Sequence, residues 1–227
     1  MTTNEARQRI LDVGIVPVVR ASSSRKAQAA AEAVYAGGIS IVEITMTVPG
    51  AIQVISEVVR ALGGECLIGA GTVLDAQMAQ QCIDAGAEFI VSPGFDPDTV
   101  KLAKRAGKLA LPGALTPTEV VNAWKCGADF VKVFPCGAVG GASYLKALRG
   151  PLPQVPLVPT GGVNLTNAAE LIRAGAAALG IGGELISAAA LDSGNTAQIT
   201  ELARKYVAAV REARNPAPVG AMAGDRR

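Results

Sequence analysis

Short apolar segments alternate with longer alanine-rich segments along most of this chain, and that alternation limits the fold more than any other feature. The short segments are typical of buried strands, and eight of them occur, at residues 15–20, 40–45, 66–70, 89–92, 109–111, 130–134, 157–160 and 178–182. The segments between them favour amphipathic helices, for example at residues 25–35, 51–62, 76–85, 97–106, 117–125 and 165–174. Strands that alternate with helices in this way predict an α/β fold with parallel strands.

Glycine and proline mark the ends of several predicted helices. Glycines lie at positions 37, 86, 107, 127 and 175, where a helix commonly ends in a left-handed residue. Eight strand–helix units in 227 residues favour one (β/α)8 TIM barrel, with an open doubly wound sheet as the alternative. We expect a short N-terminal helix over the bottom of the barrel, a single domain at residues 1–213 and a flexible C-terminal tail at residues 214–227.

Charge and composition exclude several classes of function. The net charge is only +2 and the basic residues are dispersed, which argues against nucleic acid or an anionic membrane as a partner. The first residues contain neither the apolar core of a secretion signal nor a membrane-length span, so we expect a cytoplasmic protein whose four cysteines are buried, reduced thiols. The chain has no histidine, which excludes histidine bases and histidine-bound metal.

A lysine interrupts the sixth apolar segment, between Phe130 and Phe134. Side chains alternate along a strand, so Lys132 shares a face with these two phenylalanines. An ammonium group among apolar side chains loses hydration, which favours the neutral, nucleophilic amine. Lys132 is therefore a candidate for Schiff-base formation with a ketone. The alternative is a side chain that extends past the outer layer to solvent.

A glutamate, Glu43, interrupts the second apolar segment in the same way as Lys132 interrupts the sixth. Val42 and Ile44 form an all-apolar face that suits the helices, which directs Glu43 into the barrel. There it can meet Lys132, and a glutamate in a partly dry site can act as an acid and a base near neutral pH. The structural alternative is a buried Lys–Glu ion pair, which contributes little net stability.

Glycine pairs follow the last two predicted strands. Gly161 and Gly162 come after Pro159 and Thr160, and Gly183 follows the eighth strand. In a TIM barrel these two loops commonly bind phosphate, because bare backbone N–H groups accept an anion. The alternative is that the glycines serve only tight turns.

Seven segments together resemble the KDPG/KHG aldolase family, which comprises 2-keto-3-deoxy-6-phosphogluconate and 4-hydroxy-2-oxoglutarate aldolases. They are VEITMTVPGA (42–51), IGAGTVLDAQ (68–77), FIVSPG (89–94), LPGALTPTEV (111–120), VKVFP (131–135), VPTGGVN (158–164) and GIGGEL (180–185). The resemblance covers most of residues 11–210 in unbroken order. It implies a homotrimer of (β/α)8 barrels, without metal or cofactor, that cleaves a 2-keto-4-hydroxy acid to pyruvate and an aldehyde.

The same resemblance implies roles for individual residues. The Schiff-base lysine falls on Lys132, the proton-shuttling glutamate on Glu43, and the threonine beside the pyruvate carboxylate on Thr72. The remaining matches line the site, namely Pro93, Pro112 and Phe134 around the imine and Thr160, Gly161, Gly162 and Gly183 on the phosphate side. The expected substrate is 2-keto-3-deoxy-6-phosphogluconate, and the expected aldehyde is glyceraldehyde 3-phosphate.

Two positions depart from the family pattern. Many relatives carry an arginine four residues beyond the glutamate, where this chain has Thr47. Arg20 ends the first strand, and we expect it to hold the substrate carboxylate with Thr72, unless it forms only a rim salt bridge. Glu184 stands where some relatives have a phosphate-binding serine. A carboxylate there would repel a phosphate, so 4-hydroxy-2-oxoglutarate or an unphosphorylated 2-keto-3-deoxy sugar acid is the alternative substrate.

Two other classes of protein use similar parts. A phosphate-binding barrel isomerase or synthase would use Glu43 as a base and Lys132 only as a positive charge, without imine formation. A non-catalytic relative would bind keto acids without turnover. Trapping of an imine distinguishes the aldolase from both.

Overall fold

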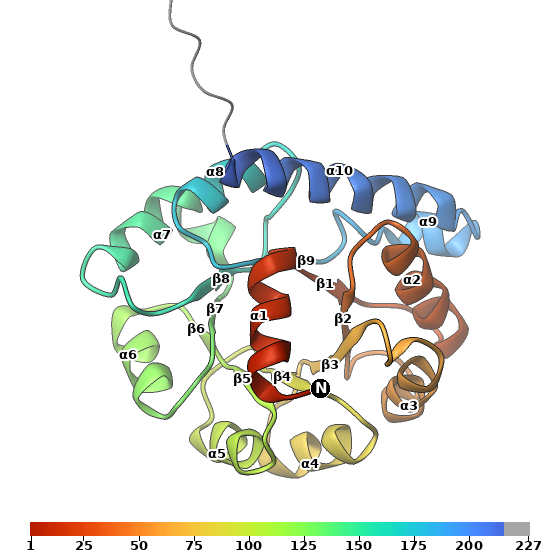
Figure 1. Ribbon diagram of the computed structural model, residues 1–227, viewed down its shortest axis with the longest axis horizontal. Helices are drawn as coiled ribbons and strands as arrows, with labels where there is room; N and C mark the ends of the chain where they lie inside the picture. The colour runs from red at the N-terminus through yellow and green to blue at the C-terminus, as the bar shows by residue number, and fades with distance from the viewer. Residues whose placement is uncertain (216–227) are drawn as a thin grey trace, which may run out of the picture.

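The computed structural model describes residues 1–215 and shows strands and helices in alternation (Figure 1). The strands are β1 (Ile15–Val19), β2 (Ile41–Thr45), β3 (Leu67–Gly71), β4 (Phe89–Val91), β5 (Leu109–Leu111), β6 (Gly113–Ala114), β7 (Val131–Val133), β8 (Leu157–Pro159) and β9 (Leu179–Ile181). The helices are α1 (Thr3–Val13), α2 (Ser24–Ala36), α3 (Ala51–Leu62), α4 (Ala76–Asp84), α5 (Pro97–Arg105), α6 (Pro117–Lys125), α7 (Ala142–Arg149), α8 (Ala168–Arg173), α9 (Ala188–Asp192) and α10 (Thr196–Arg214). A 3-10 helix, η1 (Cys136–Val139), follows β7.

All paired strands are parallel. Six of them form one sheet in the order β5-β4-β3-β2-β1-β9, and β6, β7 and β8 form another. The strands curl into a half-barrel, and the helices lie around its outside in Figure 1. The predicted parallel α/β fold is thus confirmed.

The fifth predicted strand is followed by a further short strand, β6, which was not predicted from the sequence. Pro112 separates β5 from β6 and accepts a hydrogen bond from the backbone N–H of Lys132 (2.9 Å).

Capping residues explain where several helices begin. Thr116 and Glu119 form a reciprocal capping box at the start of α6, and Pro117 occupies its first turn. The helix predicted at residues 165–174 begins only at Ala168, because the Asn164 side chain accepts hydrogen bonds from the backbone of Thr166 and Asn167 in a turn.

The end of α10 limits the predicted tail. Arg214 is the last residue of α10, and it donates hydrogen bonds to the carbonyls of Asp12 (2.7 Å) and Ala177 (3.2 Å). Position 214 therefore belongs to the folded part rather than to the tail predicted at residues 214–227. Asn215 caps the end of α10, and residues 216–227 lie outside the described residues.

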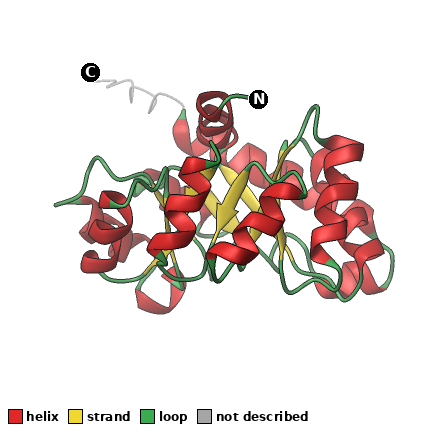
Figure 2. Cartoon of the chain, turned by 90° about the horizontal axis from the view of Figure 1, so that it is seen from below, coloured by secondary structure: helices red, strands yellow, loops and turns green. Residues whose placement is uncertain are grey.

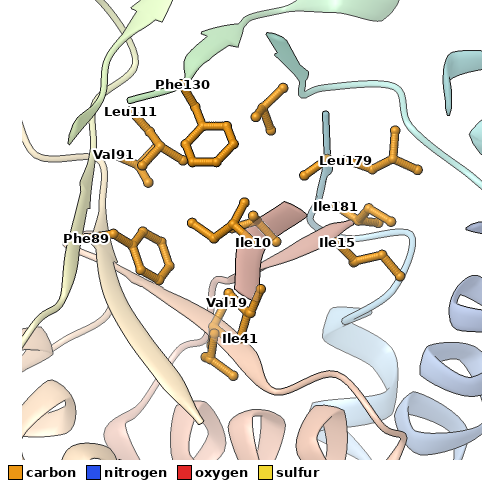
Figure 3. Packing of buried hydrophobic residues seen from close by; sticks show 14 of the residues in the cluster. Ile10, Ile15, Val19, Ile41, Phe89, Val91, Leu111, Phe130, Leu179 and Ile181 are labelled. Carbon is orange, nitrogen blue, oxygen red and sulfur yellow. The ribbon is translucent and has the colours of Figure 1, made fainter. Parts of the chain in front are cut away.

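The predicted N-terminal helix, α1, lies across one end of the strands (Figures 1 and 2). Thr3 and Arg9 of α1 donate hydrogen bonds to carbonyls of Gly107 and Glu65, which precede β5 and β3. Ile10 packs among buried residues that include Phe89 of β4 and Phe130, which directly precedes β7 (Figure 3). The amino ends of the strands are therefore covered, and the site must lie at their carboxyl ends.

The four cysteines, all within the described part of the chain, are free thiols. Cys66, Cys82 and Cys136 are buried as predicted, whereas Cys126 is only half-buried. Burial raises the pKa of Cys66 to about 12 and that of Cys82 to about 11, so both stay protonated at neutral pH. In residues 1–215, no helix combines the length and the apolar character that crossing a membrane requires.

Candidate active site

Lys132 is the central residue of β7 and is buried, with 4% of its surface exposed. It is the only buried lysine of residues 1–215. Its ammonium lies over the ring of Phe134, 5.1 Å from the centroid. Phe130 lies at the amino end of β7, on the same face as Lys132. It is fully buried, and Arg7 of α1 lies over its ring. This burial argues against the alternative in which the lysine extends to solvent.

Glu43 of β2 is also buried, with 2% of its surface exposed. Burial raises the pKa of Glu43, and the positive charges of Lys132 and Arg20 oppose this rise. The ion pairs of the described residues include neither Glu43 nor Lys132, so the close pair of the structural alternative is not formed. Glu43 Oε1 has no hydrogen-bond partner within residues 1–215. A buried, unpaired carboxyl group is unusual in a core and suits a group that exchanges protons.

The glycine loops after β8 and β9 line a cavity of about 230 Å³. Its walls include Arg20, Phe134, Thr160, Gly161, Gly162, Gly183 and Glu184. Gly161 and Gly162 have φ angles of 84° and 78°, a conformation that favours glycine. The structure thus brings together the predicted phosphate loops, Arg20 and Phe134.

A larger cavity of about 1040 Å³ lies between α3 and α4, and its lining contains none of the predicted site residues.

Arg20, which follows β1 at its carboxyl end, lines two cavities. Its guanidinium is close to the loop after β9, since a Cβ built on Gly182 would be 3.7 Å from Arg20 Nη1. It also lines a second cavity, of about 300 Å³, together with Thr47. The side chain at the end of β1 therefore faces the space beside the position where many relatives carry an arginine. The structure places Arg20 with the glycine loops, and the linings of these two cavities do not include Thr72.

Glu184 is exposed and lines the glycine-loop cavity. Its charge also acts on Tyr206 of α10. Burial and, secondarily, the charge of Glu184 raise the pKa of Tyr206 to about 12. Glu184 therefore lies on the cavity wall, where its charge can act on a bound anion.

Thr72 follows β3 directly and is the only non-glycine residue of the described chain with a positive φ angle, 58°. A β-branched residue in this region costs about 1–3 kcal/mol and persists where the surrounding structure requires it, often at ligand sites. Pro93 follows β4 and is half-buried, and its carbonyl packs closely against Gly113 of β6. Thr72 and Pro93 therefore lie at the carboxyl ends of neighbouring strands, on the rim that the sequence predicted.

From the sequence, Gly71 is one of the glycines after the third strand that could let a ligand approach the backbone, and its contact with Glu43 was not predicted. The predicted strand ended at residue 70, whereas β3 includes Gly71, which faces the carboxyl group of Glu43. A glycine inside a strand is unfavourable and marks a close approach of another group, and this was the available signal.

A family model described as "KDPG and KHG aldolase" matches residues 7–202. The chain belongs to this family. It is 37% identical over 209 residues to the 2-dehydro-3-deoxy-phosphogluconate aldolase of Treponema pallidum, covering 90% of this chain and 96% of the relative. It is 35% identical over 202 residues to the KHG/KDPG aldolase of Escherichia coli K12, covering 88% and 94%. The resemblance and the aldehyde-lyase class predicted from the sequence are confirmed.

A solved structure of this family bears on the chemistry. The KDPG aldolase of Legionella pneumophila, with pyruvate captured as a covalent carbinolamine intermediate, aligns with a TM-score of 0.81 and 32% identity. The alignment covers 88% of this chain and 96% of that structure. A carbinolamine is the adduct that precedes a Schiff base, so this relative forms a covalent bond between an amine and pyruvate.

Proposed function

We propose that this KDPG/KHG aldolase family member is a Schiff-base aldolase that cleaves 2-keto-3-deoxy-6-phosphogluconate to pyruvate and glyceraldehyde 3-phosphate. The observation that carries the proposal is a buried lysine and a buried, unpaired glutamate in one parallel α/β fold, Lys132 on β7 and Glu43 on β2. The lysine supplies the nucleophile and the electron sink, and the glutamate moves the protons. This chemistry requires neither a metal nor an organic cofactor.

The two residues act in sequence. The Lys132 amine adds to the C2 ketone to give a carbinolamine, which loses water to form a protonated imine. Glu43, directly or through a water, removes the proton of the C4 hydroxyl. The C3–C4 electron pair then moves to the imine nitrogen, which releases the aldehyde and leaves an enamine. Glu43 returns its proton to C3, and hydrolysis of the new imine releases pyruvate and the free lysine.

Borohydride reduction in the presence of pyruvate tests this assignment. We expect a stable adduct on Lys132 and on no other lysine, because the others are exposed or half-buried and their ammonium groups remain solvated. Peptide mass mapping locates the adduct. Absence of label on Lys132 would contradict the aldolase and would favour the isomerase, synthase or non-catalytic alternatives.

We further propose that Thr160, Gly161, Gly162 and Gly183 bind the substrate phosphate through the glycine-loop cavity. The positive φ angles of Gly161 and Gly162, whose bare backbone lies on the cavity wall, support an anion site there. Glu184 on the same wall favours the second candidate, an unphosphorylated acid such as 4-hydroxy-2-oxoglutarate.

A comparison of kcat/KM for the phosphorylated and dephosphorylated six-carbon acids decides between these substrates. We expect a clear preference for the phosphorylated acid, because remote binding energy is used at the reacting centre. Glu184→Ser should increase that preference by removing like-charge repulsion, while Glu184→Gln separates the loss of charge from the change of size. Equal kcat/KM values on the wild type would contradict a functional phosphate site.

The other end of the substrate is proposed to lie between Arg20 and Thr72. Arg20 faces the cavity beside Thr47, from which a guanidinium can bind a carboxylate. Thr72 holds a strained backbone conformation at the adjoining rim. Pro93 and Phe134 would form the walls of the pyruvate pocket, with Phe134 over the reacting amine.

We also propose that the strands close into a single eight-stranded barrel. One residue separates β5 from β6, which would join the two sheets as one strand. On the other side, the Thr160–Gly180 bridge and the hydrogen bond from the Ala177 N–H to the Leu157 carbonyl (2.9 Å) link β8 with β9.

The single-domain, homotrimeric and cytoplasmic assignments rest on the sequence and the family resemblance. Analytical ultracentrifugation tests the trimer.

A further inference from the structure

We infer that Gly71 is a positioning residue for the reaction, because its missing side chain leaves the space that the Glu43 carboxyl group occupies. A Cβ built on Gly71 would lie 1.8 Å from Glu43 Oε1, 2.5 Å from Cδ and 2.7 Å from Cγ. Any side chain at position 71 would therefore displace the carboxyl group. The inference rests on the proposed function, in which Glu43 moves the protons.

The register of the sheet explains why an added side chain at position 71, and not at position 69, would meet the Glu43 carboxyl group. Glu43 is paired with Gly69, and Thr45 with Gly71. Because side chains in strands lean along the strand, the Glu43 side chain reaches one layer further, over Gly71. The space over Gly69 is filled instead by the ring of Phe89, to which a Cβ would be 2.4 Å. Two glycines on one face of β3 thus accept side chains from the two neighbouring strands.

Steric contact is important here because Glu43 Oε1 has no hydrogen bond within the described chain. A carboxyl group without such a bond is held by the shape of its surroundings. Proton transfer requires the base within hydrogen-bond reach of the substrate, and a misplacement of about 1 Å costs on the order of 10² in rate. The atoms that an added Cβ meets are the far end of a side chain, so Glu43 should move and the backbone should remain.

Gly71→Ala tests the inference, with Gly69→Ala as the matched control on the same face of the same strand. The measurements are cleavage, exchange of the pyruvate methyl protons in D2O, borohydride trapping at Lys132 and thermal unfolding. We expect Gly71→Ala to lower exchange and cleavage by about 10²-fold while trapping persists. Gly69→Ala should lower Tm by overpacking against Phe89 and should keep both rates near the wild-type values.

A double-mutant cycle with Glu43→Gln separates positioning from a general packing defect. In the Glu43→Gln background, Gly71→Ala should change the residual rate less than about twofold, because its effect acts through the carboxyl group. Equal losses in both backgrounds, or wild-type exchange by Gly71→Ala, would overturn the inference. The cycle gives this answer even if Gly69→Ala does not fold. Failure of the wild type to form any adduct would instead contradict the proposed function itself.

Discussion

Lys132→Arg should lower kcat/KM by about 10⁴-fold or more, which is the scale of losing a catalytic nucleophile. The guanidinium stays charged and cannot form an imine, so the covalent route is lost while the positive charge remains. This distinguishes a nucleophile from an electrostatic stabiliser, which arginine would replace in part. The measurements are steady-state cleavage and the disappearance of borohydride labelling with pyruvate.

Two further variants control this result. Lys132→Met removes the charge as well as the amine and is unbranched, so it should fit the buried site between Val131 and Val133. Lys125→Arg on α6 is exposed and makes the same chemical change without effect on turnover. If Lys132→Arg retained a substantial fraction of the wild-type rate, the isomerase or synthase alternative would be favoured over the aldolase.

The sequence predicted the parallel α/β fold because its signals are local. Apolar runs and helix caps such as Thr116 with Glu119 act within a few residues, and they need no knowledge of distant partners. The alternation along β2 and β7 similarly located Glu43 and Lys132 on buried positions. The short strand β6 was missed because two residues, Gly113 and Ala114, carry no periodic pattern.

Contacts between distant residues were beyond the sequence for a physical reason. The relation of Gly71 to Glu43 depends on the register of β2 with β3, which a one-residue shift would abolish. The position of Arg20 depends on its side-chain conformation at the mouth, where it lies beside Gly182 between two cavities. The residue types therefore indicated the chemistry, while the distances between them required the fold.

Glu43→Gln should lower the rate of cleavage by about 10²–10⁴-fold, because the amide keeps the shape but cannot transfer the proton. Imine formation should persist, so borohydride trapping at Lys132 continues while exchange of the pyruvate methyl protons falls with cleavage. The matched control is Glu57→Gln on α3, which removes a carboxylate from the outer helical layer. Near wild-type cleavage by Glu43→Gln would show that Glu43 is only a structural residue.

The pH dependence of stability gives an independent measure of the same carboxyl group. Burial raises the pKa of Glu43 in the folded protein above its value in the unfolded chain. Between these two pKa values the folded state binds more protons, so the free energy of unfolding falls as pH rises through this window. The stability that the protonated Glu43 carboxyl contributes is fully present below its pKa in the unfolded chain and is lost above its pKa in the folded protein.

Glu43→Gln stays neutral throughout, so its Tm should exceed that of the wild type by a margin that grows with pH across the window. The wild-type cleavage rate should rise over the same window, because only the ionised carboxylate can accept the C4 hydroxyl proton. A Tm difference independent of pH would show that Glu43 does not titrate in the folded protein with a raised pKa.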